Sequence, residues 1–179
     1  MCLKCGQKLN GFVCLKCSLP FRFQFCLGER KGILKELIND FKYNSNKAAG
    51  LKLVEVLADS LILDQNAVLV PLPTIAKHKR ERGFGQTEWL AGKLSRVFGC
   101  DVSNLLSRAK NTVQVGASSD KRKIQAEEAY MIQGAVDAEL NYVLFDDVWT
   151  TGSSMLAAAK LLKDHGANNV SALLLAKTI

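Results

Sequence analysis

The chain has 179 residues, a hydrophobic content of 48% and a formal net charge of +7 at pH 7. This length suits one globular domain with room for a small extra module, and the composition is that of a chain that buries a core. No stretch approaches the roughly 20 consecutive apolar residues of a membrane span, and the start lacks the apolar segment of a secretory signal. We therefore expect a cytoplasmic protein without membrane insertion, and the basic charge favours nucleic acid or phosphorylated ligands as partners.

Cysteines dominate the first 17 residues, where two C-x-x-C pairs are formed by Cys2, Cys5, Cys14 and Cys17. Two such pairs can present four sulfur atoms as a tetrahedron, which is typical of a structural zinc site. A redox C-x-x-C would instead stand at the mouth of a βαβ unit, which this segment does not resemble. We expect residues 1–27 to form a Zn²⁺ module and residues 28–179 to form the main domain. Cys26 and Cys100 stand alone and are expected to be buried.

The next segments alternate between helical and strand patterns. Apolar residues at helical spacing predict amphipathic helices within residues 29–43 and 47–63, and the apolar run 67–73 predicts a buried strand leading into a loop. A helix, a strand, a helix and a strand are then expected over residues 84–99, 141–147, 153–166 and 170–176. This order predicts an α/β fold, with a mostly parallel, doubly wound sheet that carries helices on both faces.

Two acids and a hydroxyl-rich turn follow the strand at 141–147. The candidate site residues are Asp146, Asp147, Thr150, Thr151, Gly152, Ser153 and Ser154. Ligands of parallel sheets bind beyond the carboxyl ends of the strands, and free N–H groups at the start of a helix attract phosphate. The acids can accept hydrogen bonds from adjacent sugar hydroxyls, so a phosphorylated sugar is one interpretation. A surface turn that caps the helix through Thr151 or Ser153 is the other.

Basic runs lie at residues 77–82 and 121–123, next to the expected ligand edge. The candidate contacts to a diphosphate or to DNA are Pro73, Thr74, Lys77, Lys79, Arg80 and Arg82. Such loops can neutralise a diphosphate or follow a nucleic-acid backbone, and the alternative is a solvated basic surface. Phe84 and Trp89 can stack on bases, although helical spacing favours a core position for Trp89.

The stretch "YVLFDDVWTTGSS" is similar to the signature loop of the type I phosphoribosyltransferases, which bind 5-phosphoribosyl-1-pyrophosphate (PRPP). The resemblance implies that Asp146 and Asp147 bind the ribose hydroxyls, that the following turn binds the 5′-phosphate, and that Mg²⁺ accompanies the diphosphate. Trp149 departs from the pattern, which usually has an aliphatic residue there.

Nearly the whole chain resembles the ComF (competence protein F) family. The resemblance rests on the four-cysteine start, on "VPLPTIAKHKRERGFGQTEWLA", on "LLSRAKNTVQVGASSDKRKIQAEEAY" and on the acid-acid loop. This chain departs from the family at Gly85 and Gln125, where Asn is usual, and Cys26 lacks the partner of a further cysteine pair.

The ComF resemblance implies a PRPP-binding protein that acts in natural transformation, the uptake and handling of single-stranded DNA in the cytoplasm. It implies a helicase-like motor and a membrane channel as DNA-uptake partners. Whether the chain turns PRPP over, and with which acceptor, stays open. Two other hypotheses are a metabolic phosphoribosyltransferase that joins PRPP to a base or amine, and a DNA-binding module in which the phosphate loop is a relic.

Overall fold

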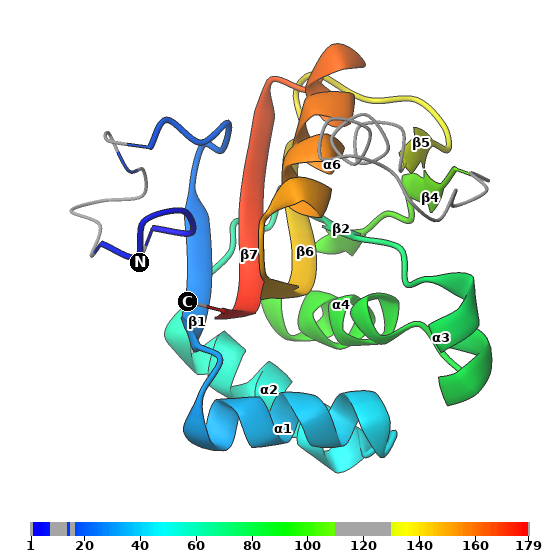
Figure 1. Ribbon diagram of the computed structural model, residues 1–179. Helices are drawn as coiled ribbons and strands as arrows, with labels where there is room; N and C mark the ends of the chain where they lie inside the picture. The colour runs from blue at the N-terminus through cyan, green and yellow to red at the C-terminus, as the bar shows by residue number, and fades with distance from the viewer. Residues whose placement is uncertain (1, 8–13, 15–16, 110–129, 179) are drawn as a thin grey trace, which may run out of the picture.

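A five-stranded sheet forms the centre of the computed structural model, which describes residues 2–7, 14, 17–109 and 130–178 (Figure 1). The strand order is β1-β7-β6-β2-β3, and all four pairings are parallel. The strands are β1 (Gln24–Glu29), β2 (Ala67–Pro71), β3 (Asp101–Val102), β6 (Asn141–Trp149) and β7 (Asn169–Lys177). The expected parallel α/β architecture is confirmed.

Helices cover both faces of this sheet. They are α1 (Gly32–Tyr43), α2 (Lys47–Ser60), α4 (Gln86–Phe98) and α6 (Ser153–Asp164), whereas α3 (Ala76–Arg82) has no buried residue and lies to the side of the sheet (Figure 1). One face carries α6 and a two-stranded hairpin of β4 (Leu106–Arg108) and β5 (Tyr130–Ile132). The opposite face carries α4, with α2 and α1 packed beside it (Figure 1).

The sequence of β6 explains why both faces are covered. Alternate side chains of a strand point to opposite faces, and this strand is apolar at consecutive positions. Tyr142 and Leu144 join the core beneath α6, whereas Val143 and Phe145 join the core beneath α2 and α4. A strand of this kind is stable only with apolar packing on each side.

The basic run at residues 77–82 forms helix α3, not the loop that we expected. Lys, Arg and Glu favour helices, and Lys77 and Glu81 form an i,i+4 ion pair with an N–O distance of 3.9 Å. Gly83 ends the helix in the left-handed region, at φ 78°. The segment has no apolar stripe, so hydrophobic periodicity gives no helical signal there.

β1 extends across the expected boundary between residues 27 and 28. It pairs with β7, with Gln24 opposite Ala172 and Gly28 opposite Ala176, so the sheet begins upstream of residue 28. The sheet therefore begins inside the range 1–27 that we assigned to the Zn²⁺ module.

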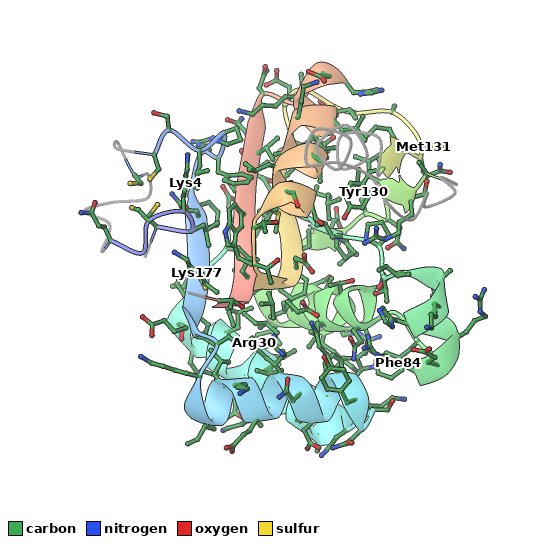
Figure 2. All side chains as sticks on the ribbon, in the orientation of Figure 1. Lys4, Arg30, Phe84, Tyr130, Met131 and Lys177 are labelled. Carbon is green, nitrogen blue, oxygen red and sulfur yellow. The ribbon has the colours of Figure 1, made fainter. Side chains whose placement is uncertain are left out.

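Two buried polar side chains attach the first cysteine pair to the sheet. Gln24, 4% exposed, accepts a hydrogen bond from the backbone N–H of Leu3 at 3.0 Å. Lys177, at the end of β7, donates to the carbonyls of Cys2 and Lys4 at 3.4 and 3.3 Å (Figure 2). Because buried polar groups need partners, these contacts hold the backbone of the pair in one position on the sheet.

The two cysteines that stand alone in the sequence, Cys26 and Cys100, are buried as expected, and burial raises the pKa of both thiols.

Within the part of the chain that the structure describes, no helix is long and apolar enough to cross a membrane.

Candidate functional site

The two acids of β6 lie where the neighbouring strand has already ended. β2 stops at Pro71, which is in register with Phe145, while β6 continues to Trp149 beside β7. We expected this strand to end at residue 147, but pairing with β7 extends it further. Asp146 and Asp147 therefore line a cavity of about 270 Å³ together with the segment Leu72–Ile75 that follows β2.

The two acids have different surroundings. Asp147 forms an ion pair with Lys42 of α1, with an Nζ–Oδ2 distance of 2.7 Å. Asp146 accepts a hydrogen bond from the backbone N–H of Asp147 at 2.8 Å. Burial raises the pKa of Asp146 to about 7, and the adjacent charge of Asp147 acts in the same direction. Near neutral pH the pair thus offers one group that accepts hydrogen bonds and one that can also donate.

The turn after β6 presents backbone donors at the start of α6. Gly152 is the N-cap residue, adopts a left-handed φ of 79° and has no side chain to cap the helix. The hydroxyl of Thr151 accepts a long hydrogen bond, 3.4 Å, from the N–H of Ser153, and the hydroxyls of Thr151 and Ser153 share one at 3.0 Å. A hollow of about 40 Å³, bounded by Asp146, Leu174 and residues 148–155, lies within this turn. Hydroxyls and N–H groups therefore converge on one small space.

Trp149 determines the shape of this turn. Its ring is buried, packs edge-on against Phe21 with centroids 6.5 Å apart, and lies against Gly152. A Cβ atom at position 152 would overlap the ring, so the turn requires glycine both for its φ and for this contact. The departure from the family pattern at Trp149 thus has a structural role.

The segment after β2 is tied to the first turn of α4. Thr74 donates to Glu88 at 2.8 Å, and Thr87 donates to the carbonyl of Leu72 at 2.6 Å. The Glu88 carboxylate occupies the space that a Cβ atom at Gly85 would need. The departure from the family at Gly85 is therefore explained by Glu88, which folds back onto the loop.

The structure separates the predicted diphosphate or DNA contacts into two groups. Pro73, Thr74 and Arg82 line the cavity, whereas Lys77, Lys79 and Arg80 are exposed on α3 and do not line it. The second basic run at residues 121–123, and the departure at Gln125, lie outside the described residues.

Several cavity residues were not expected from the sequence. They are Lys42, Tyr43, Gln86, Arg108 and Tyr130. Lys42 and Tyr43 end an amphipathic helix, where they look like ordinary surface residues. Arg108 and Tyr130 belong to strands of three residues, too short for a periodic pattern. These residues are recognised as cavity residues only because the fold brings them together.

Phe84 and Trp89 pack with Phe41 as one aromatic cluster, with ring centroids 5.3 to 6.3 Å apart. Both are half-buried against the core beneath α2 and α4. The core interpretation of Trp89 is confirmed, and Phe84 shares it.

The four N-terminal cysteines come together as one cluster. Their sulfur atoms all lie within 4.8 Å of one another, and those of Cys5 and Cys14 are 3.8 Å apart. A tetrahedral zinc site with Zn–S bonds of about 2.3 Å has S–S edges of about 3.8 Å, so the cluster fits one metal ion. Without a metal ion, hydrogen bonds from the Gln7 backbone and the other cysteines lower the pKa of Cys5, and hydrogen bonds within the cluster raise that of Cys17, so one thiol holds a proton that a bound metal would displace.

The two C-x-x-C pairs also share a backbone pattern. Gly6 donates to the carbonyl of Cys2 at 3.0 Å, and Ser18 donates to that of Cys14 at 3.2 Å. Both residues follow the second cysteine of their pair and have positive φ, 77° and 43°. The second knuckle thus turns at Ser18, where the sequence offered no glycine as a signal.

Comparison with known proteins places this architecture in a family. The chain is 30% identical over 188 residues to the DNA utilization protein YhgH of Escherichia coli strain K12, which covers 99% of this chain and 79% of that protein. The chain belongs to the ComF family. Competence protein F of Haemophilus influenzae is 26% identical over 186 residues, covering 94% of this chain and 81% of that protein. The competence protein ComFC of Bacillus subtilis is 31% identical over 103 residues, which are 58% of this chain and 41% of that protein.

The other comparisons add little to the ComF assignment. No family model matches the chain. An adenine phosphoribosyltransferase from Trypanosoma brucei aligns with a TM-score of 0.44 and 16% identity, over 73% of this chain and 54% of that chain. A hypoxanthine phosphoribosyltransferase from Staphylococcus aureus aligns with a TM-score of 0.41 and 11% identity, over 82% of this chain and 74% of that chain. These two structural likenesses are distant.

Proposed function

We propose that this chain binds PRPP in the cavity between β6 and the segment after β2, and that it acts in the handling of single-stranded DNA during natural transformation. The observation that carries the proposal is that Asp146 and Ser154 line both the cavity, which Asp147 also lines, and the hollow of the Gly152 turn, so that the two spaces adjoin. A phosphorylated ribose needs acceptors for its hydroxyls and a cradle of donors for its phosphate, in that order along the ligand.

The charges around the cavity support a ligand with more than one phosphate. Lys42, Arg82 and Arg108 line it, and His78 adds a further donor. Lys42 is already paired with Asp147. Among the described residues, Arg82 and Arg108 donate to neutral oxygens, those of the Gln86 side chain and the Pro73 carbonyl, and lie over the rings of Tyr43 and Tyr130. Arginine forks suit phosphate oxygens, and these two lie on the side of the cavity formed by the segment after β2.

The role in DNA handling comes from the relatives and from α3. Relatives of this chain are named competence proteins and DNA utilization proteins. The exposed cations Lys77, Lys79 and Arg80 lie on the helix that also carries His78 and Arg82 into the cavity. A DNA backbone on α3 would thus lie next to the bound PRPP.

The cysteine cluster would hold a structural Zn²⁺ in this function. Cys2, Cys5, Cys14 and Cys17 supply all four ligands of a tetrahedron, which leaves no open position for a substrate. We expect PRPP to enter with Mg²⁺ on its diphosphate. Transfer, if an acceptor attacks the anomeric carbon, would break the bond to the diphosphate and release pyrophosphate.

Titration calorimetry of the zinc-loaded chain with PRPP and Mg²⁺ tests the proposal, with ribose 5-phosphate as a shorter ligand. We expect binding in the micromolar range, weakened at least about tenfold by Asp146→Asn with Asp147→Asn because charge-assisted hydrogen bonds are lost. Asp59→Asn with Asp101→Asn is the matched control, since both acids are exposed and lie outside the cavity. No binding at millimolar PRPP would overturn the proposal, and pyrophosphate release with a small base or amine would favour a metabolic transferase.

A further inference from the structure

The hydroxyl of Tyr130 is a buried and incompletely paired polar group. The side chain is 4% exposed, and its hydroxyl has no well-formed hydrogen bond to any described residue, although the Ser154 side chain lies close to it. Burial raises the pKa of this phenol, although Arg108 opposes the shift, so the group is a neutral hydrogen-bond donor at physiological pH. Buried polar groups in native proteins nearly always have partners, so an incompletely paired hydroxyl at this place requires an explanation.

The position of Tyr130 suggests what the partner is. Tyr130 lines the same cavity as Asp146 and Ser154; the Ser154 side chain lies near enough to lower its pKa as a hydrogen-bond partner does, and the charge of Asp146 raises it. In Figure 2 Tyr130 lies beside the sheet while Met131, the next residue of β5, lies further out, in agreement with its 50% exposure. The hydroxyl therefore belongs to the end of the cavity that is formed by β6 and the start of α6.

Arg108 holds the Tyr130 ring in this position. The two residues are paired in the β4–β5 hairpin, and the guanidinium carbon of Arg108 lies 5.3 Å from the ring centroid. Arg108 also donates from Nε to the carbonyl of Pro73 at 3.0 Å, which ties the hairpin to the segment after β2. The ring is thus supported by a cation–π contact that does not involve its hydroxyl.

We propose that Tyr130 donates a hydrogen bond to an oxygen of the sugar-phosphate half of the ligand, between Asp146 and Ser154, and so helps to select a phosphorylated sugar. This inference rests on the proposed function, because it takes the ligand to be PRPP or its ribose 5-phosphate portion. In the free protein the hydroxyl is desolvated and has no well-formed hydrogen bond to a described residue, and the ligand supplies the missing acceptor. Part of the cost of burying the group is therefore recovered only when the ligand binds.

The variant Tyr130→Phe removes this oxygen and keeps the ring, the packing and the contact with Arg108. We expect PRPP and ribose 5-phosphate to bind about tenfold more weakly, by a similar factor for both, because both ligands share the half that Tyr130 contacts. We expect the melting temperature of the ligand-free variant to be unchanged or higher, because an incompletely paired buried hydroxyl is removed.

Tyr142→Phe is the matched control. Tyr142 is 3% exposed and lies at the other end of β6, where its hydroxyl accepts a hydrogen bond from the backbone N–H of Asp137 at 2.8 Å. Its removal should lower the melting temperature and leave both affinities unchanged. Affinity and melting temperature of the two variants thus distinguish a hydroxyl that contributes to ligand binding from one that stabilises the fold.

Each other outcome overturns the inference in a recognisable way. Equal affinity of wild type and Tyr130→Phe, or weaker binding together with a lower melting temperature, would show that the hydroxyl does not select the ligand. A loss for PRPP but not for ribose 5-phosphate would place the hydroxyl at the diphosphate. A wild-type chain that binds neither ligand would refute the proposed function itself.

Discussion

Asp146 and Asp147 are neighbours in the chain, but among the described residues only Asp147 has a cation within ion-pair distance. Lys42 of α1 pairs with Asp147, whereas burial and the charge of Asp147 raise the pKa of Asp146. Asp146 therefore changes its protonation near neutral pH. This difference leads to a prediction about pH.

We predict that Asp146→Asn stabilises the free chain more at about pH 8 than at about pH 5. The pKa of Asp146 is raised from 3.8 to about 7 on folding, so its favourable contribution is complete below about pH 4 and is lost as the pH rises to about 7. Asparagine has no such loss, and the gain above pH 7 has an upper bound of about 4 kcal/mol. Thermal unfolding across this pH range measures it.

Asp147→Asn is the contrasting variant. It should destabilise the chain at both pH values because it leaves Lys42, whose side chain is only 18% exposed, without its partner. A gain for Asp146→Asn that is the same at both pH values would contradict the assignment of the titration to Asp146.

We also predict that Gly152→Ala costs more stability than Gly166→Ala. Both glycines have positive φ, 79° and 99°, but a Cβ atom at 152 meets the Trp149 ring whereas one at 166 meets nothing within 4 Å. Backbone strain alone costs about 1 kcal/mol, and overpacking a rigid ring adds roughly 1–3 kcal/mol. Chemical denaturation of both variants measures the difference, and equal costs would show that Trp149 moves aside.

At the scale of elements, α3 carries cations on two surfaces, to which the proposed function assigns different ligands. His78 and Arg82 reach the cavity, and Lys77, Lys79 and Arg80 lie on its exposed surface. A helix with cations on both sides can contact a bound phosphate ligand and a nucleic-acid strand at the same time. The two functions should therefore be separable by mutation.

We predict that Lys77→Ala, Lys79→Ala and Arg80→Ala together weaken single-stranded DNA binding and leave PRPP binding unchanged. Removing three phosphate contacts should reduce the slope of log affinity against log salt by about 2, since each contact on a single strand contributes about 0.7. Fluorescence anisotropy over a salt series measures this.

The control for α3 removes three exposed lysines elsewhere, Lys35, Lys52 and Lys163, and so matches the change in net charge. An equal loss of DNA affinity in both triple variants would mean that only net charge matters. A loss of PRPP binding in the α3 variant would mean that the two surfaces are coupled.

The elements that the sequence predicted and those that it missed differ in length and apolar content. β6, β7 and α6 were predictable because long apolar runs, bounded by Gly152 and Gly166, leave few alternatives. The strands β4 and β5 have three residues each and no pattern, and β1 contains Gln24, whose burial depends on a partner in the cysteine segment. Such elements depend on contacts that are distant in the sequence.

The same distinction holds for the site. The acids and the turn were predictable because they are consecutive residues. Lys42, Arg108 and Tyr130 come from three separate elements and converge only when the sheet has formed. No sequence pattern around Lys42 or around Asp147 indicates that the two form an ion pair.

At the scale of the whole molecule, the cysteine segment and the sheet share buried polar contacts. Gln24 and Lys177 bind the backbone of residues 2–4, and Trp149, Thr150 and Lys177 line a second cavity of about 380 Å³ with Leu3 and Cys5. The cysteine cluster therefore lies near the Gly152 turn as well as near the edge of the sheet.

We predict that Cys14→Ser releases the metal and speeds amide exchange in residues 2–7 and in β1, but not in β6. Loss of one thiolate breaks the tetrahedron, and metal binding supplies much of the folding free energy of so short a segment. Metal analysis and hydrogen exchange measure the two effects.

Cys100→Ser serves as the control for the metal prediction, because Cys100 is buried away from the cluster and its replacement should leave the metal content unchanged. Full metal content in Cys14→Ser would refute the assignment of this residue as a ligand. Loss of the metal in Cys14→Ser without faster amide exchange in β1 would show that the stability of this sheet edge does not depend on the cysteine cluster.

The pairing of β1 with β7 also has a consequence for synthesis. β1 is synthesised well before β7, its hydrogen-bonding partner in the sheet, with Gln24 opposite Ala172. Until β7 is made, β1 exposes an unpaired edge, which is a site for wrong pairing with other nascent chains. The four cysteines all precede β1 and can bind metal before β7 exists, so the cysteine segment can be held together while β1 still lacks its partner.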